Sequence, residues 1–330
     1  MRKLLTTTAI ASVALAGAAI AEVKVSGSIE QTINSNSYDK AADQHKGSTA
    51  IGSETNLTVS SSKELDNGMT VSGSFRMENT TIDHKSFKIS SGGFAMELGI
   101  DTGTNITGDI LPTVADQTHD FMKHTSNGGT TVLMADSLIG GDAHDREHIG
   151  FSYKTDAGTF AINYAPDESA ANNSSSAVTD GGGSALEYVF AGGLGVDGLN
   201  VKVGQQKSES DSTSDGDITE KTYQASYTYG QFSVGAAIRD LDDETSTTEK
   251  SKSNAYAVSY AVNDQISISY EDRTTETDST TDKDEEAKAF SVGYNLGGLA
   301  IVANYGTVDN MGGASGENGE AFQLRSVYKF

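Results

Sequence analysis

The stretch FSVGYNLGGLAIVANY, from Phe290 to Tyr305, alternates apolar or aromatic side chains with small and polar ones on both sides of Gly297 and Gly298. Successive side chains of a strand point to opposite faces, so a period of two predicts a strand with one apolar and one polar face. Two such runs joined by a short glycine turn predict a β-hairpin.

The same unit recurs along the chain. Further hairpins are predicted over residues 151–164, 188–203, 223–238 and 256–270. After each return strand comes a long polar stretch, and these stretches cover residues 166–183, 208–221, 239–252, 273–287 and 308–320. Short turns that alternate with long loops are typical of barrels that cross an outer membrane.

The two ends of the alternating region are predicted to meet. The first strand runs from Val23 to Ile33, and the chain ends in an alternating aromatic strand from Phe322 to Phe330. Pairing of these two strands would leave no sheet edge exposed.

Composition excludes several functions. The chain has 330 residues, no cysteine, and 46 acidic residues against 23 basic ones, for a net charge of −23. Without cysteine there is no disulfide, Cys-ligated zinc or thiol nucleophile. Such an acidic balance argues against nucleic acid as a partner, because its binding depends on basic side chains.

Residues 1–21 have the form of a secretory signal peptide. Arg2 and Lys3 precede an apolar run, and Ala19-Ile20-Ala21 has the small-x-small pattern of a cleavage site. We expect cleavage after Ala21, which would change the net charge from −23 to −25. The mature chain, residues 22–330, would then be exported through the periplasm.

Chain length sets the size of the barrel. With residues 22–330 and 16 strands, each strand and its connection share about 19 residues, which suits spanning strands of about 9–11 residues. Eight strands would leave much longer loops. We therefore predict an all-β fold, a transmembrane antiparallel β-barrel of 16 strands, which is wide enough to enclose water.

The order of these elements resembles a known family. The signal peptide, the opening EVKVSG at residues 22–27, the repeated hairpins and the ending SVYKF at residues 326–330 are similar to the Gram-negative general porins, particularly those of alphaproteobacteria. The resemblance implies an outer-membrane location, a homotrimer, and a long loop after the fifth strand that folds inward and narrows the barrel.

Residues 102–146 are predicted to be that constriction loop. They follow the strand from Phe94 to Asp101 and show no strong alternation. A further hairpin around Asn127 would raise the strand number to 18, but it would turn Lys123 and Asp136 towards lipid. A midplane lysine costs about 2–4 kcal/mol, so 16 strands are favoured.

Charged residues of the loop and of the wall are candidates for the site. The loop supplies the carboxylates of Asp109, Asp116 and Asp120. Strand parity turns seven basic residues towards the lumen, namely Lys24, Arg76, Lys88, Lys202, Arg239, Arg273 and Arg325. Carboxylates opposite cations would set a transverse field that orients dipolar solutes.

We therefore predict a passive diffusion channel for ions and small hydrophilic solutes, with a weak preference for cations. Acidic loops at the mouth could also bind Ca²⁺ loosely. The alternatives are a substrate-selective outer-membrane channel and an exported acidic surface β protein, such as an adhesin. No catalytic activity is expected, because the G-x-G-x-x-G at residues 193–198 precedes a strand and the H-x-x-E-H at residues 144–148 lies at a loop-to-strand junction.

Overall fold

The computed structural model describes residues 22–39, 48–114, 146–166, 183–209, 216–244, 250–277, 283–313 and 315–330. In these ranges the chain forms strands throughout, with one turn of 3-10 helix, η2 (Met311–Gly313). The strands are β1 (Glu22–Asp39), β2 (Ser48–Glu64), β3 (Thr70–Glu78), β4 (Thr81–Ser91), β5 (Phe94–Ile100), β6 (His148–Lys154), β7 (Thr159–Ala165), β8 (Ala185–Gly192), β9 (Leu199–Ser208), β10 (Ile218–Tyr229), β11 (Phe232–Asp243), β12 (Lys250–Ala261), β13 (Ile266–Thr277), β14 (Glu285–Asn295), β15 (Leu299–Asp309) and β16 (Asn318–Lys329).

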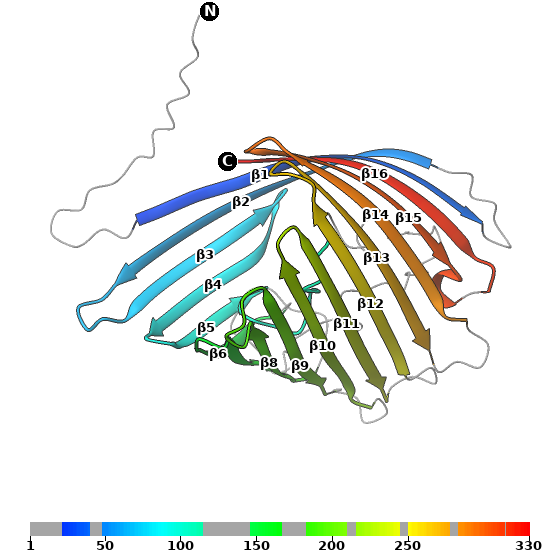
Figure 1. Ribbon diagram of the computed structural model, residues 1–330. Helices are drawn as coiled ribbons and strands as arrows, with labels where there is room; N and C mark the ends of the chain where they lie inside the picture. The colour runs from blue at the N-terminus through cyan, green and yellow to red at the C-terminus, as the bar shows by residue number, and fades with distance from the viewer. Residues whose placement is uncertain are drawn as a thin grey trace, which may run out of the picture.

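Each strand pairs with its neighbours in sequence, and β1 pairs with β16, so the sheet closes into an antiparallel barrel (Figure 1). At the seam, the backbone N–H of Gly27 donates to the carbonyl of Phe330 at 2.9 Å, and the N–H of Phe330 donates back at 3.0 Å. The predicted pairing of the first and last strands is confirmed.

The predicted number of 16 strands is also confirmed. Strands β5 and β6 pair directly, with Leu98 opposite Ile149, so no further strands stand between them. The alternative of 18 strands is therefore wrong for this barrel. The residues that suggested it, 121–134, lie outside the described residues.

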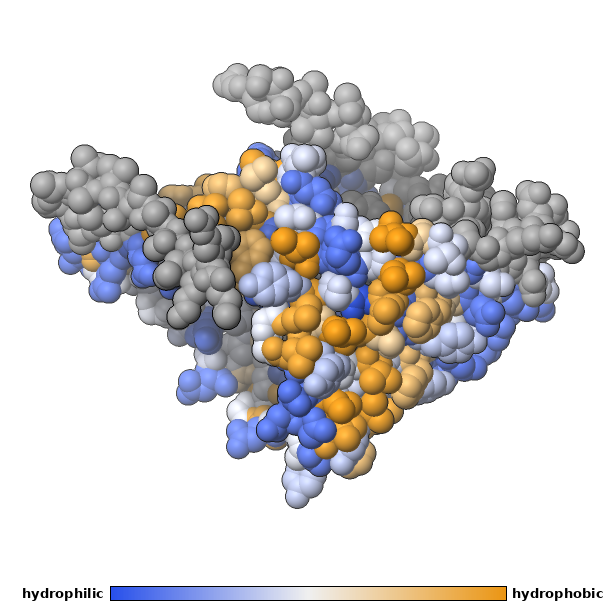
Figure 2. All heavy atoms as spheres, turned by 90° about the horizontal axis from the view of Figure 1, so that it is seen from above, coloured by the Kyte–Doolittle hydropathy of each residue, from blue (hydrophilic) through white to orange (hydrophobic). Residues whose placement is uncertain are grey.

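The outer face carries the apolar half of each alternation. Register places one row of large side chains across six strands, at Val234, Val258, Tyr270, Phe290, Tyr305 and Phe322. Every member of this row is exposed although it is apolar or aromatic. Figure 2 shows such hydrophobic residues gathered over the middle of one face, with hydrophilic residues towards its edges. This is the surface expected of a wall that meets lipid.

The tight turns lie where glycine was predicted to allow them. Gly230 joins β10 to β11 with φ of 59°, and Gly297 joins β14 to β15 with φ of 86°. Glycine adopts these left-handed conformations without a steric clash, because it has no Cβ. The G-x-G-x-x-G stretch is the turn between β8 and β9, as predicted. His148 opens β6, whereas His144 lies outside the described residues.

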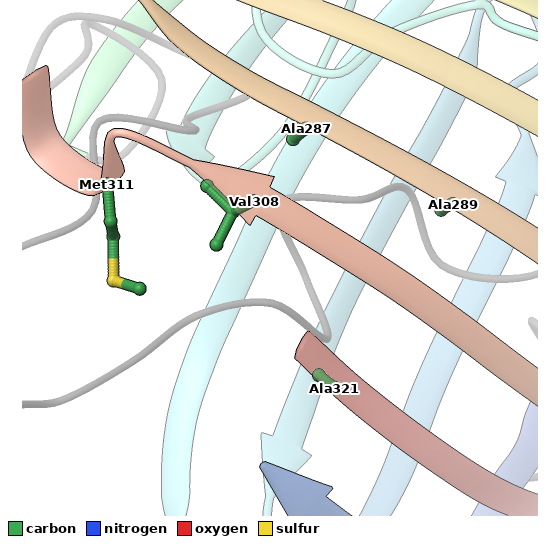
Figure 3. Packing of buried hydrophobic residues seen from close by; sticks show 5 residues of the cluster. All are labelled: Ala287, Ala289, Val308, Met311 and Ala321. Atoms are coloured by element: carbon green, nitrogen blue, oxygen red, sulfur yellow. The ribbon is translucent and has the colours of Figure 1, made fainter. Parts of the chain in front are cut away.

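The burial of inward side chains differs from one part of the barrel to another. Inward side chains of β7 to β15 include many that are fully buried, whereas no described residue of β1 to β4 is buried. One buried cluster lies where η2 meets the wall, with Met311 packed against Val308 and inward alanines of β14 and β16 (Figure 3). The described ranges contain no helix long and apolar enough to cross a membrane.

Candidate functional site

Residues 102–114, here called the inward segment, run along the inside of the wall after β5. Three of their backbone N–H groups donate to side chains of distant strands. Ile106 donates to Glu187 Oε2 of β8 at 2.9 Å. Ile110 donates to Gln224 Oε1 of β10 at 2.8 Å, and Val114 donates to Ser269 Oγ of β13 at 2.9 Å. The inward segment therefore follows the inner wall from β5 to β13, and the predicted inward fold is confirmed for residues 102–114.

Two apolar side chains fasten the inward segment to the wall. Ile106 is fully buried against Ala161 and Val189 of β7 and β8. Leu111 packs on three alanines of β11 and β12, namely Ala237, Ala255 and Ala257. Small inward residues leave room for the segment, which buries apolar area that would otherwise face water.

Glycines of the wall mark the same path. A Cβ on Gly204 of β9 would lie 2.5 Å from Ile106 Cγ2, and one on Gly235 of β11 would lie 2.7 Å from Pro112 Cδ. A Cβ on Gly293 of β14 would lie 2.6 Å from Val114 Cγ1. Real Cβ atoms do not come that close to other carbons, so the close approach of the segment requires glycine at these inward positions.

A buried charge cluster centres on Asp109. Its carboxylate accepts hydrogen bonds from Arg239 Nε at 3.3 Å and Nη2 at 3.2 Å, and it also contacts Arg273 Nη2. Arg239 Nη1 binds Glu220 Oε1 at 2.7 Å, and Arg273 Nη2 binds Glu271 Oε1 at 3.0 Å. All five side chains are at most 2% exposed. Three carboxylates thus surround two guanidiniums, for a cluster charge of −1.

This contact corrects one expectation. The sequence predicted that loop carboxylates and wall cations would stand opposite each other across a constriction, but Asp109, Arg239 and Arg273 touch each other and are buried. Lys202 is engaged as well, because its Nζ donates to the carbonyls of Thr107 and Gly108. These three cations bind the inward segment to the wall. Asp116 and Asp120 lie outside the described residues.

The root of the inward segment is held from both sides. Asp101, with φ of 53°, receives Arg76 Nη2 on its carboxylate at 2.9 Å, and its carbonyl accepts from His84 Nδ1 at 2.6 Å. Arg76 also pairs with Asp83 at 2.7 Å. On the other side, Thr102 Oγ1 lies 3.4 Å from His148 Nε2 of β6.

The other predicted wall cations, Lys24, Arg76, Lys88 and Arg325, face inward on β1, β3, β4 and β16. Lys88 Nζ lies 3.8 Å from Glu97 Oε2, and Arg325 Nε lies 2.7 Å from Glu30 Oε2. Lys24 is exposed on β1 beside the serines of β2 and β3. The structure therefore divides the seven predicted cations among separate places on the wall.

Sequence reasoning missed several residues of the site. Glu187 and Gln224 are polar residues at inward positions of β8 and β10, and their parity alone could have placed them inside. Lys154 also faces inward at the end of β6 and was not among the predicted cations. No local signal identifies which inward polar residues would meet residues 102–114, because those contacts join positions up to 164 residues apart.

Comparison with known proteins agrees with this geometry. A family model described as Gram-negative porin matches residues 6–329. The chain belongs to the Gram-negative porin family. This porin is a passive diffusion channel of the outer membrane, and its inward segment occupies the place expected of the constriction loop. No sequence among the curated proteins matches it.

Solved porin structures share the fold of this porin. An anion-selective porin from Comamonas acidovorans has a TM-score of 0.67 at 14% identity, covering 94% of this chain and 100% of that one. OmpT of Vibrio cholerae has a TM-score of 0.65 at 14% identity, covering 95% and 99%. A porin refined at 1.8 Å resolution has a TM-score of 0.65 at 17% identity, covering 94% and 100%.

Proposed function

We propose that this porin passes ions and small hydrophilic solutes with a weak preference for cations. The observation that carries the proposal is the neutralisation of the wall arginines. Arg239 and Arg273, which would otherwise attract anions, share three buried carboxylates. Arg76, Lys88 and Arg325 each have an acidic partner too. The chain as a whole is strongly acidic, so the field near the passage favours cations.

Reversal potentials in planar bilayers test this selectivity. Across a KCl gradient, the sign of the potential should correspond to a cation permeability above that of chloride. The preference should decline towards unity as salt rises, because screening shortens the reach of the acidic groups. A potential of anion-selective sign at low salt would contradict the proposal.

The inward segment is proposed to set the size limit. Deletion of residues 105–135 should enlarge the single-channel conductance, whereas unchanged steps would show that the constriction lies elsewhere. A substrate-selective channel remains the second candidate. It would need a saturable site along the passage, and such a site would make current block depend on solute concentration.

A homotrimer is proposed for the assembly. Strands β5, β6 and β7 have seven residues each, fewer than the roughly 9–11 that a spanning strand needs. An ion pair lies beside them, with Lys85 Nζ of β4 3.2 Å from Oε1 of Glu147, the residue before β6. Contact with a second copy would cover this short, charged part of the wall. One solved OmpT of Vibrio cholerae is described as a trimer form.

Size measurement in detergent tests the assembly. The protein should elute at three times the monomer mass, and Glu147→Lys, which places two cations together, should weaken the association. The exchange Lys85→Glu with Glu147→Lys should restore it. A monomer with full channel activity would contradict the trimer.

Three further expectations stay proposals. We infer that residues 1–21 are removed on export, and N-terminal sequencing of the mature protein should begin at Glu22. We also infer that the chain is non-catalytic, as a porin requires no reaction to pass solutes. Loose Ca²⁺ binding at the acidic loops also stays a proposal. The acidic residues of these loops include Asp217, Asp242 and Asp284, whereas Asp211, Asp215, Asp278 and Asp282 lie outside the described residues.

A further inference from the structure

A cavity of about 510 Å³ lies on the inner wall between the root of the inward segment and the short turns that end β4 and β6. Its sides come from β4 to β7, and its floor consists of small residues, among them Gly103, Gly150 and Ala161. This volume falls in the range of sites for small molecules. The cavity is separate from the buried Asp109 cluster.

The cavity is locally positive in an acidic protein. Lys88 and Lys154 line it together with one carboxylate, Glu97. Lys88 Nζ lies 3.8 Å from Glu97 Oε2, a long ion pair in which the Lys88 side chain is 40% exposed. Within the described part of the chain, the Lys154 side chain makes neither a hydrogen bond nor an ion pair. The cavity therefore offers one unneutralised positive charge to an anion.

Register places the two ammonium groups at opposite ends. Lys88 is level with Glu97 of β5 and Gly150 of β6. Lys154 lies four residues beyond Gly150 on β6, which is about 13 Å along the strand, and β6 is two strands from β4, about 10 Å across. Two flexible lysines at this spacing can hold both ends of an extended molecule of about six carbons.

Hydroxyl groups line the space between the two lysines. Ser90, Ser152 and Thr159 line the cavity, and none of these hydroxyls has a side-chain hydrogen bond within the described residues. Asn163 is held in place by donating from Nδ2 to Thr104 O at 2.9 Å and to Glu187 Oε1 at 2.5 Å. Its Oδ1 lies beside Gly103 and Gly150, and an amide oxygen is a hydrogen-bond acceptor.

We propose that this cavity transiently binds small polyhydroxylated carboxylates, with dicarboxylates of about six carbons held most tightly. The lysines take the carboxylates, while the serines, Thr159 and Asn163 take the hydroxyls. The Glu97 carboxylate repels anions, and a ligand hydroxyl that donates a hydrogen bond to it offsets this repulsion, so hydroxylated carboxylates are favoured. The proposal rests on the barrel being a water-filled channel, since solutes reach the cavity only from the lumen.

Three probes with the same carbon chain test the site. Glucarate carries two carboxylates, gluconate carries one, and glucitol carries none, so they differ mainly in charge. In single-channel recordings, glucarate should interrupt the current for longer than gluconate, and glucitol should not interrupt it. Equal interruption by all three probes would overturn the proposal, because block would then reflect size alone.

Matched variants locate the effect. Lys154→Gln should remove the advantage of glucarate over gluconate and shorten the glucarate block about two- to fivefold, as expected for a partly exposed charge pair. Lys24→Gln is the control, because it removes one inward lysine at the same end of the barrel, on β1 and away from the cavity. An equal effect of both variants would show that only the general field matters and would overturn the site.

Failure of the proposed binding site can be distinguished from failure of the proposed channel function. If the wild type and both variants conduct stepwise in KCl but glucarate never blocks, the site fails and the channel stands. If neither the wild type nor either variant conducts, the proposed channel function is overturned. Stepwise conductance of Lys154→Gln in KCl, whatever its size, also shows that this variant folds.

Discussion

Arg239 of β11 and Asp109 of the inward segment lie 3.2 Å apart and are almost completely buried, although 130 residues separate them in sequence. Because Arg273 contacts the same carboxylate, one acidic group fastens the segment to two strands. Removing one partner from such a buried pair leaves an uncompensated charge, which typically costs about 3–5 kcal/mol.

The first prediction follows from that cost. Asp109→Asn should loosen the inward segment without unfolding the barrel, and single-channel records should show faster and larger current fluctuations. Two arginines would also lose a carboxylate, so the reversal potential should shift towards anions. Asp242→Asn is the control, since it removes a charge from an exposed outward position. Identical records from both variants would contradict the tethering role of Asp109.

The second prediction concerns Glu187. Its two carboxylate oxygens accept from the Ile106 N–H and from Asn163 Nδ2. Glu187→Gln replaces one acceptor by an NH₂ group that faces another donor, so about 1–3 kcal/mol of local stability should be lost. Protease cleavage within residues 102–114 should become faster in detergent-solubilised protein. Unchanged cleavage would mean that this hydrogen bond does not hold the segment.

The third prediction uses the wall glycines. Gly204→Ala and Gly235→Ala should each lower the free energy of unfolding by about 1–3 kcal/mol, because the added methyl would overlap Ile106 or Pro112. Gly73→Ala is the matched control, because the nearest atom to its added Cβ would be 3.6 Å away. Guanidinium unfolding of the refolded protein measures all three. A similar loss in Gly73→Ala would attribute the effect to the strand and not to the segment.

The fourth prediction concerns the seam. Glu30 of β1 and Arg325 of β16 pair at 2.7 Å with 15% and 23% exposure. In a double-mutant cycle with Glu30→Gln and Arg325→Met, the coupling free energy should be about 0.5–1 kcal/mol, as for other partly exposed pairs. Each single variant should also be less heat-resistant in detergent than the wild type. Strict additivity of the two changes would show that the pair does not contribute to closure.

Most of the fold could be predicted from sequence because its signal is local. Alternation over residues 290–305 is complete within one hairpin, and glycine at position 297 follows from the turn conformation alone. The strand count followed from chain length, since a bilayer fixes how many residues each strand requires. The apolar face was identified by parity, which needs no knowledge of the partner strand.

The site could be predicted only in part because its contacts are not local. Parity turned Arg239 and Arg273 inward correctly, but it contains no information about which residues lie opposite them. The path of the inward segment depends on small residues such as Gly235 and Ala255 on separate strands, and none of these is unusual in its own hairpin. Only the three-dimensional arrangement shows that they form one path.

The direct pairing of β1 with β16 makes the arrangement of strands circular. Gly27 and Phe330 are hydrogen-bonded neighbours, although 303 positions separate them along the chain. A circularly permuted gene that joins these ends by a short linker, and opens the chain at Gly230 or Gly297, would keep every strand beside the same two partners. In such a protein the order of synthesis changes while the finished wall does not.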